Sequence, residues 1–417
     1  MVKIVNLKKT FGSRVLFQDI NLSLDTGKRY GLIGANGAGK TTLLNMLSGT
    51  EEITDGEVQV QNGKKVGVLS QNQFAYEDFT LADAVLYGNK RLYDAIKKKE
   101  ELYLEEYTDA IGEQLGELEI ICCEEDPTYE YDVKITKILE SLGFPAETHG
   151  ELMSTITGGD KFKVLLAQVL YPKPDVLFLD EPTNNLDITT ISWLENQLQH
   201  HDGTMVVISH DRHFLNAVCT NILDVDFKKI REFTGTYDDW YIASTIIAKQ
   251  ASVDREKKMK EKEELEAFVR RFSANASKAK QATSRQKQLD KLDISAIEVS
   301  SRRDPSIVFK QEKPISKEVL EFKNISKSYE GEVVLKDCSL MLEKKDKIAL
   351  IGPNGAGKTT LCEILMENIK PDAGEVKWGA TANVSYFPQN TTDLIKGDIT
   401  LYDWLRDFDR DADISEI

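Results

Sequence analysis

The sequence predicts an α/β fold of two related domains that are joined by an α-helical hairpin linker. A glycine-rich loop is repeated: GANGAGKTT at 34–42 returns as GPNGAGKTT at 352–360, 318 residues later. Each copy follows an apolar run, at 30–33 or 348–351, that we expect to be a strand. A strand, a glycine loop and a helix form the setting in which this motif binds nucleotide phosphates, so the two domains are predicted to be P-loop NTPase domains. A long charged segment separates the two copies and predicts the linker.

The residue types in the two loops assign the parts of a nucleotide site. Backbone N–H groups of the glycines close on the phosphates, the lysine reaches the terminal phosphates, and the following threonine hydroxyl ligates Mg²⁺. The predicted nucleotide-binding residues are Gly34, Ala35, Asn36, Gly37, Ala38, Gly39, Lys40, Thr41 and Thr42, and in the second copy Gly352, Pro353, Asn354, Gly355, Ala356, Gly357, Lys358, Thr359 and Thr360. Thr41 and Thr359 are the Mg²⁺ ligands predicted from the loops.

The repeat extends beyond the loops, which indicates that a whole domain is duplicated. Three further pairs share the displacement of 318 residues: Phe11 with Tyr329, DGEV at 55–58 with AGEV at 373–376, and Gln71 with Gln389. The first copy continues through further motifs to about residue 235, and the second is shorter, so we expect the second domain to be incomplete. The predicted domains are 1–235 with a helical insertion at about 80–155, a hairpin linker at 236–317, and an incomplete second domain at 318–417.

Length, charge and cysteine usage limit the class of protein. A chain of 417 residues is long enough for two or three domains with cores of their own. The net charge of −16 argues against a protein that coats nucleic acid generally. Five cysteines without C-x-x-C spacing favour a reducing compartment and no zinc site. No window approaches the ~20 apolar residues that span a bilayer, so we expect a soluble cytoplasmic protein without a membrane partner.

Two β-rich runs after the first loop carry candidate catalytic residues. The run VLFLDE at 176–181 is an apolar strand that ends in two acids. Asp180 suits a Mg²⁺ position beside Thr41, and Glu181 is placed to orient or deprotonate an attacking water. The run at 204–209 is a second predicted strand, and His210 follows it directly. The imidazole of His210 could contact a γ-phosphate. The alternative for the first run is a buried strand with a solvated acidic end.

The segment from 238 to 292 predicts two antiparallel helices, because it is charged, almost free of Gly and Pro, and interrupted by SANAS at 273–277. Its tip has seven basic residues against one acid between Arg270 and Lys291. In an acidic chain this concentration favours contact with RNA, and a solvated helical face is the alternative. The predicted RNA-contacting residues are Arg270, Arg271, Lys278, Lys280, Arg285 and Lys287.

The helical insertion at 95–140 has the opposite character. Between Glu100 and Glu130 there are twelve acids and no lysine or arginine. Such a surface does not suit contact with a phosphate backbone. We expect either a solvated helical surface or one that meets a basic protein.

A further anion-binding feature leads to a family. Thr157, Gly158 and Gly159 open an amphipathic helix, and a hydroxyl with two glycines at a helix start suits an anion. Together with EPTNNLD at 181–187 and His210, this pattern resembles the ATP-binding cassette (ABC) ATPases. The resemblance implies ATP and Mg²⁺ as cofactors, and a signature at 157–159 that touches the γ-phosphate of an ATP held by the opposite domain. Asp160 stands where the family usually has Gln or Glu.

The same resemblance assigns roles to residues outside the loops. Phe11 and Tyr329 match the aromatic residue that stacks on adenine, although a lone aromatic is otherwise more typical of a core. Gln71 is assigned to catalysis and to Mg²⁺, and Gln389 to nucleotide and Mg²⁺ in the second copy. Glu181 and His210 complete the expected catalytic set.

The linker distinguishes among classes of ABC protein. FVRRFSANASKAKQATSRQKQL at 268–289 looks very like the linker of the ABC-F proteins, cytoplasmic factors that act on ribosomes. The resemblance implies an ATP hydrolase in translation whose two cassettes close on ATP and whose linker tip approaches transfer RNA and ribosomal RNA. One alternative is the energising ATPase subunit of an ABC transporter, which needs a membrane partner. Another is an RNA-binding or scaffold fragment that does not hydrolyse ATP.

The second alternative, a fragment that does not hydrolyse ATP, arises because ABC sites are composite. The first loop needs a facing signature from a second domain, and no second signature is present in the sequence. The second loop could meet 157–159 but has no acidic strand or histidine of its own. We therefore expect either that the chain is a fragment of a longer protein, or that it is a degenerate or split product for which pairing with another ABC cassette completes the sites.

Overall fold

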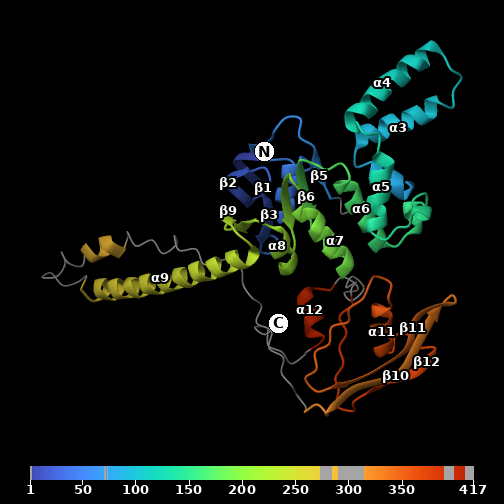
Figure 1. Ribbon diagram of the computed structural model, residues 1–417. Helices are drawn as coiled ribbons and strands as arrows, with labels where there is room; N and C mark the ends of the chain where they lie inside the picture. The colour runs from blue at the N-terminus through green and yellow to red at the C-terminus, as the bar shows by residue number, and fades with distance from the viewer. Residues whose placement is uncertain are drawn as a thin grey trace. The chain divides into compact units, whose positions relative to one another are not determined.

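The computed structural model describes residues 2–69, 72, 74–272, 284–289, 314–388 and 399–408. The chain divides into two compact units, Met1–Ser306 and Ile307–Ile417 (Figure 1). The first unit contains an α/β core, a helical subdomain and the long helix of the predicted linker. The second unit contains one antiparallel sheet and two labelled helices.

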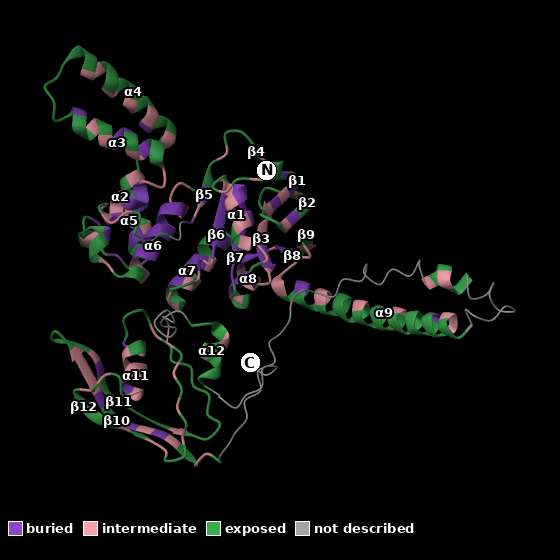
Figure 2. Cartoon of the chain, turned by 180° about the vertical axis from the view of Figure 1, so that it is seen from behind, coloured by how far each residue is buried: buried purple, intermediate pink, exposed green. Residues whose placement is uncertain are grey.

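The core of the first unit is a six-stranded sheet in the order β5-β6-β7-β3-β8-β9. Its strands are β3 (Arg29–Gly34), β5 (Val66–Val68), β6 (Val176–Asp180), β7 (Thr204–Ile208), β8 (Asn221–Asp226) and β9 (Lys229–Thr234). All pairs are parallel except β8 with β9. Every residue of β6 and β7 is buried, as expected of central parallel strands that are covered on both faces (Figure 2). The strands predicted at 176–179 and 205–208 are confirmed.

A second, antiparallel sheet shares a core with this one. It has the order β2-β1-β4, with β1 (Val2–Phe11), β2 (Arg14–Leu24) and β4 (Asp55–Val60). Helix α1 (Lys40–Ser48) buries Leu43, Leu44, Met46 and Leu47 in a cluster with side chains of both sheets. This packing fixes the direction of the helix that begins in the glycine loop.

Helices on the other face of the parallel sheet form a second cluster. They are α6 (Gly158–Leu170), α7 (Ile188–Gln199), α8 (Arg212–Val218) and the start of α9 (Tyr237–Phe272). In α6 most residues from Lys161 to Val169 are buried, so this helix is held firmly although its first turn is only partly buried. The helix predicted to follow residue 157 is therefore confirmed.

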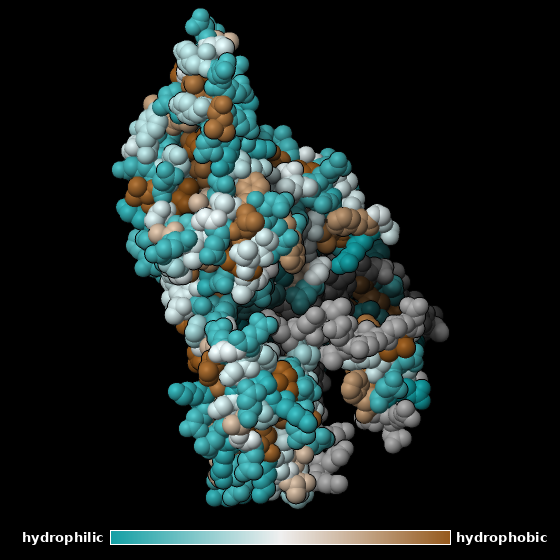
Figure 3. All heavy atoms as spheres, turned by 90° about the vertical axis from the view of Figure 1, so that its right-hand side faces the viewer, coloured by the Kyte–Doolittle hydropathy of each residue, from teal (hydrophilic) through white to brown (hydrophobic). Residues whose placement is uncertain are grey.

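Residues 81–141 form a helical subdomain. Its helices are α2 (Leu81–Leu86), α3 (Lys90–Leu102), α4 (Asp109–Glu125) and α5 (Tyr131–Ser141). They share a core with α6 that includes Leu81, Val85, Leu92 and Leu139. The helices α3 and α4, named the arm here, project from this core (Figure 1). Figure 3 shows the arm at the top of the view with a mainly hydrophilic surface and scattered hydrophobic side chains.

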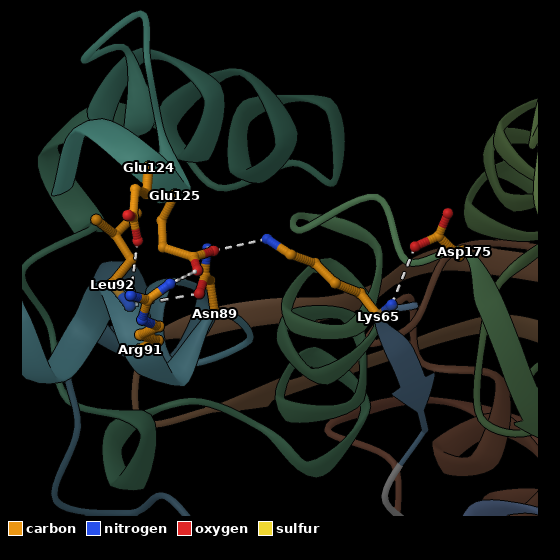
Figure 4. A network of polar contacts seen from close by, with 7 residues as sticks. All are labelled: Lys65, Asn89, Arg91, Leu92, Glu124, Glu125 and Asp175. Atoms are coloured by element: carbon orange, nitrogen blue, oxygen red, sulfur yellow. Dashed lines mark hydrogen bonds and ion pairs between the residues drawn. The ribbon is translucent and has the colours of Figure 1, made fainter. Parts of the chain in front are cut away.

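The base of the arm is tied to the parallel sheet by charged side chains (Figure 4). Lys65, which precedes β5, donates from Nζ to Glu125 at 2.6 Å and from its backbone N–H to Asp175 at 3.0 Å. Arg91 pairs with Glu124 and Glu125 at 2.7 and 3.1 Å. At least six of the twelve acids between Glu100 and Glu130 have such partners within the unit: Glu100, Glu101, Glu119, Glu124, Glu125 and Asp126. The arm is therefore less acidic at its surface than its composition predicts.

The linker begins with one long helix, α9, of 36 residues. Leu265 is buried on it, and the guanidinium of Arg285 lies 5.9 Å from the ring centroid of Phe268. This contact brings the helical residues 284–289 beside α9, and the hairpin itself stays a prediction. The predicted tip, with Lys278 and Lys280, lies outside the described residues. None of the helices described in the structure is long and apolar enough to cross a membrane.

The second unit repeats the antiparallel sheet of the first. Its elements are β10 (Glu318–Tyr329), β11 (Glu332–Glu343), α11 (Lys358–Leu365), β12 (Ala373–Trp378) and α12 (Leu401–Arg406). The order β11-β10-β12 matches β2-β1-β4. The register matches too, because Val2 pairs with Leu24 and Val60, and Leu320 pairs with Leu342 and Trp378. The structure confirms the duplication with its displacement of 318 residues.

The strand predicted at 348–351 is wrong. In the described structure this run is not in a strand, and Ile348, Leu350 and Ile351 are 56%, 49% and 69% exposed. The equivalent run in the first copy lies in β3, between β7 and β8, and is buried. Apolar residues form a buried strand only where neighbouring strands accept their backbone hydrogen bonds. No such neighbours flank 348–351 among the described residues of the second unit.

Candidate functional site

The first glycine loop is shaped by two glycines in the left-handed region. Gly37 and Gly39 have φ of 74° and 96°. A Cβ on Gly39 would lie 2.6 Å from a methyl carbon of Leu16, so a side chain there would clash as well as strain the backbone. Gly39 also precedes α1 and supplies no side-chain cap. The first N–H groups of α1 are therefore free of a side-chain cap and suited to an anion.

Lys40 holds the loop from within. Its Nζ donates to the carbonyl oxygens of Gly34 at 3.0 Å and Ala35 at 3.3 Å. Arg14 Nη2 donates to the carbonyl oxygen of Gly37 at 3.2 Å. Two cations therefore lie against the loop, and an anionic ligand with several oxygens fits this donor set.

The second loop has the same local geometry. Gly355 and Gly357 have φ of 80° and 86°, and Lys358 Nζ donates to the carbonyls of Gly352 at 2.9 Å and Pro353 at 2.6 Å. The loop therefore keeps its form even though the run before it is not a strand. Both copies present the donor set that the sequence predicts for phosphate.

Acids lie at the same edge of the parallel sheet as the first loop. Asp180 ends β6 and is 6% exposed, and β7 lies between β6 and the loop strand β3. The carboxyl ends of parallel strands meet at one edge of the sheet. Asp180, Glu181 and His210 therefore lie at the same edge of the sheet as the glycine loop. Helix α1 packs against β3, β6 and β7, which places its first turn, with Thr41, at this edge.

Glu181 and His210 contact one another. The backbone N–H of His210 donates to Glu181 Oε2 at 3.2 Å, and His210 Nε2 lies 3.5 Å from Oε1. Glu181 has a φ of 50°, which is unusual for a side chain of this kind. A hydrogen bond from its backbone N–H to Ile208, at 2.9 Å, holds this conformation. Strained backbone that the surroundings impose is typical of functional sites.

The predicted signature lies elsewhere in the first unit. Thr157 caps α6: its hydroxyl donates to Asp160 Oδ2 at 2.8 Å and accepts from the backbone N–H of Asp160 at 3.3 Å. Lys163 pairs with the same carboxylate at 3.0 Å. Helix α6 packs against α2, α5 and β5, whereas α1 packs against β3, β6 and β7. The structure therefore does not bring 157–159 to the loop of the same unit.

The two predicted adenine-stacking rings are exposed at strand ends. Phe11 ends β1 and is 50% exposed, and Tyr329 ends β10 and is 43% exposed. Neither ring is a core residue, so each has surface available for a base. Gln71 and Gln389 lie outside the described residues.

A family model described as ABC transporter matches residues 17–184 and 335–408, more than half of the chain. The chain belongs to this family of ATP-binding cassettes. A second model, also described as ABC transporter, matches residues 223–309. The match covers the first loop, the acidic strand and the second loop, so the predicted P-loop fold class is confirmed.

Relatives of this ABC protein align over nearly all of its length. The Probable ATP-binding protein YbiT of Escherichia coli O157:H7 is 41% identical over 98% of this chain and 77% of its own. The Energy-dependent translational throttle protein EttA of Mycobacterium tuberculosis is 32% identical over 92% of this chain and 68% of its own. The ABC transporter F family member 5 of Arabidopsis thaliana is 32% identical over 96% of this chain and 59% of its own.

The predicted RNA-contacting residues that the structure describes are exposed: Arg270, Arg271, Arg285 and Lys287. Elsewhere on α9 three lysines pair with acids of the same helix. Lys260 pairs with Glu256 at 2.8 Å and Lys262 with Glu266 at 3.7 Å. The cationic character is therefore concentrated at the end of α9 in this ABC protein.

Sequence reasoning missed two contacts of the cassette site. Arg14 was not assigned, and Glu181 was assigned without its contact to His210. Arg14 follows the turn after Phe11, and its role depends on β2 passing beside the loop, which no local pattern encodes. His213, which has no predicted role, lies on α8 and pairs with Glu195 of α7 at 3.3 Å.

Asp187, the last residue of EPTNNLD, caps α7 and provides a test by pH. Its Oδ1 accepts from Thr189 Oγ1 at 2.6 Å and from the backbone N–H of Thr190 at 2.8 Å. Burial raises the pKa of Asp187, but these hydrogen bonds outweigh burial and lower it to about 2. A lowered pKa stabilises the fold fully above the ordinary value of 3.8, and this stabilisation is lost as pH falls toward 2.

We therefore expect Asp187→Ala to lower the free energy of unfolding by about 1 kcal/mol at neutral pH. The deficit should shrink as pH falls from about 5 to about 3, because protonated Asp187 is a poorer cap. Urea unfolding at several pH values measures this deficit in the free energy of unfolding. Asp187→Asn keeps a capping oxygen that does not titrate, so its stability relative to wild type should improve over the same range. A deficit of Asp187→Ala that stays constant with pH would contradict the assignment.

Proposed function

We propose that this ABC protein hydrolyses ATP and acts on the ribosome in translation, as a cytoplasmic factor of the ABC-F type. The observation that carries hydrolysis is the contact of Glu181 with His210 at the sheet edge shared with the Lys40 loop. The ribosomal role is supported by the exposed cations at the end of α9 and by relatives named as a translational throttle protein and an ABC transporter F family member.

In the proposed reaction, Lys40 and the N–H groups at the start of α1 bind the terminal phosphates of ATP. Glu181 accepts a proton from a water whose oxygen attacks the γ-phosphorus, and the bond to the β–γ bridging oxygen breaks. The backbone N–H of His210 holds Glu181 in place. The imidazole of His210 would donate a hydrogen bond to the γ-phosphate. Mg²⁺, held by Thr41 and Asp180, would neutralise charge on the phosphates.

We further propose that a second cassette completes this site. Thr157 begins a helix that packs away from α1, so its hydroxyl cannot serve the loop at 34–42 of the same unit without a large rearrangement. A signature from another cassette would supply the missing contact to the γ-phosphate. ATP would then hold two cassettes together, and hydrolysis would release them.

The linker proposal predicts an effect of salt. Replacing Arg270, Arg271, Lys278 and Lys280 by Gln should weaken ribosome binding and flatten its dependence on salt. The slope should fall by roughly one for each cation that no longer neutralises a phosphate. Co-sedimentation with ribosomes at several salt concentrations measures both quantities. ATP binding should not change, because the substitutions are far in sequence from Lys40.

A matched control removes the same charge elsewhere on α9. It replaces Lys257, Lys258, Lys260 and Lys262 by Gln, and three of these lysines already pair with neighbouring acids. Equal reductions in ribosome binding by the two variants would mean that only net charge matters. Unchanged binding in the tip variant would make the tip a solvated face and remove the support for an RNA-contacting linker.

The alternative is an energising ATPase subunit of a transporter, which the description of the matching family favours. Such a subunit would co-purify with a membrane protein. Association with ribosomes that persists in detergent and depends on the four tip residues would contradict the transporter alternative.

A further inference from the structure

A lysine lies against each of the two exposed rings. Lys9 and Phe11 are two residues apart on β1, and Lys9 Nζ is 4.8 Å from the ring centroid. Lys327 and Tyr329 repeat the contact on β10 at 5.5 Å. Both distances fall within the range of a cation–π interaction. In each strand the register shifts immediately after the lysine, so the backbone irregularity is repeated as well.

The first lysine is anchored beneath its ring. Lys9 is only 7% exposed, and its Nζ donates to Glu51 Oε1 at 2.5 Å and to the carbonyl oxygen of Glu52 at 2.6 Å. These residues follow the last turn of α1, which begins at Lys40. A buried ammonium with two such partners has a fixed position. Lys9 therefore connects the ring of Phe11 to the helix that starts in the glycine loop.

The second unit reaches the same arrangement with a different acid. Lys327 Nζ donates to the carbonyl oxygen of Lys370 at 3.0 Å and to Asp372 Oδ1 at 2.8 Å. The carbonyl is equivalent to that of Glu52, but the acid is not equivalent to Glu51, because position 372 corresponds to position 54. The two copies thus keep an anchored lysine against an exposed ring although the anchoring acid has moved.

We propose that Lys9 and Lys327 are positioning residues for the purine base of bound ATP. The lysine lies on the inner side of the ring and the base stacks on the exposed side. The cation fixes the ring plane and draws electron density from it, which strengthens stacking with an electron-rich purine. Through Glu51 and Glu52 it also sets the ring's position relative to α1. The proposal rests on the ATP site proposed above and deepens it.

The test compares a ligand that has a base with one that lacks it. Lys9→Met keeps the length of the side chain but removes its charge, and Lys358→Ala in the same chain weakens the second site so that the first is measured. We expect calorimetry to show about three- to tenfold weaker binding of MgATP. Binding of magnesium tripolyphosphate should not change. Lys9→Arg should restore the affinity for MgATP.

Phe11→Leu separates this proposal from the ATP site on which it rests. If Phe11→Leu leaves MgATP affinity unchanged, the base does not stack on this ring and the assignment of the site itself fails. If Phe11→Leu weakens MgATP binding but Lys9→Met does not, only the positioning role is overturned. We expect Lys9→Met to have no further effect once Phe11 is Leu, because both act through one contact.

A structural role of Lys9 gives a different pattern. If Lys9→Met weakens MgATP and tripolyphosphate equally, Lys9 acts through the fold or α1, and the positioning role is overturned. Lys327→Met, measured with Lys40→Ala in place of Lys358→Ala, repeats the test at a lysine that is more exposed. Weaker binding of MgATP alone in that variant supports the proposal, and equally weaker binding of both ligands contradicts it.

Discussion

Replacing Glu181 by Gln should leave ATP bound to the first cassette but slow its hydrolysis by at least about a hundredfold. The amide keeps the shape of the side chain and can still accept the backbone hydrogen bond from His210, which is 3.2 Å from Oε2. It cannot accept a proton from water. Asp180, which is buried at the end of β6, is untouched, so the proposed ligation of Mg²⁺ should be retained.

Single-turnover hydrolysis and nucleotide affinity measured on the same preparation separate the two effects. A matched control is Glu195→Gln, because Glu195 also lies beside a histidine, His213, at 3.3 Å, but on helix α7 rather than at the end of a strand. The control should hydrolyse ATP at the rate of wild type. Equal hydrolysis rates in wild type and Glu181→Gln would show that Glu181 has no catalytic role. Loss of ATP binding in Glu181→Gln would show that its role is structural.

The parts of the site that depend on local pattern could be predicted from the sequence. The glycine loops, the buried strand that delivers Asp180 and the capped helix at Thr157 each follow from residues close together in the chain. The left-handed φ of Gly37 and Gly39 and the cap at Thr157 are the physical basis of these patterns. The duplication was predicted as well, because a constant displacement needs no knowledge of the fold.

Contacts that depend on neighbouring segments could not be predicted. The run at 348–351 has the composition of a strand, but a strand also needs partners, and these come from distant parts of a chain. Ion pairs at the arm, such as Arg91 with Glu124, are likewise invisible to a count of acids. The domain boundaries, the roles of the site residues and the linker tip stay predictions.

The difference between the two loop environments predicts unequal effects of one substitution. A Cβ on Gly34 would lie 2.8 Å from the carbonyl oxygen of Val225 and 3.1 Å from its Cβ, because β8 flanks β3. A Cβ on Gly352 would meet only the Cβ of Ala356, at an ordinary 3.6 Å. We expect Gly34→Ala to lower the stability of the first unit by about 1–3 kcal/mol, and Gly352→Ala to have little effect on the second.

Hydrogen exchange resolved along the chain measures both units in the same sample. Gly39→Ala and Gly357→Ala are the internal control, because their Cβ atoms would meet methyl carbons of Leu16 and Val334 at 2.6 and 2.7 Å. Both glycines also have positive φ, so these two variants should lose similar stability. Equal losses in Gly34→Ala and Gly352→Ala would show that the loop itself, which is the same in both copies, sets the cost. A larger loss of stability in Gly34→Ala than in Gly352→Ala would show that the flanking strand β8 sets the cost.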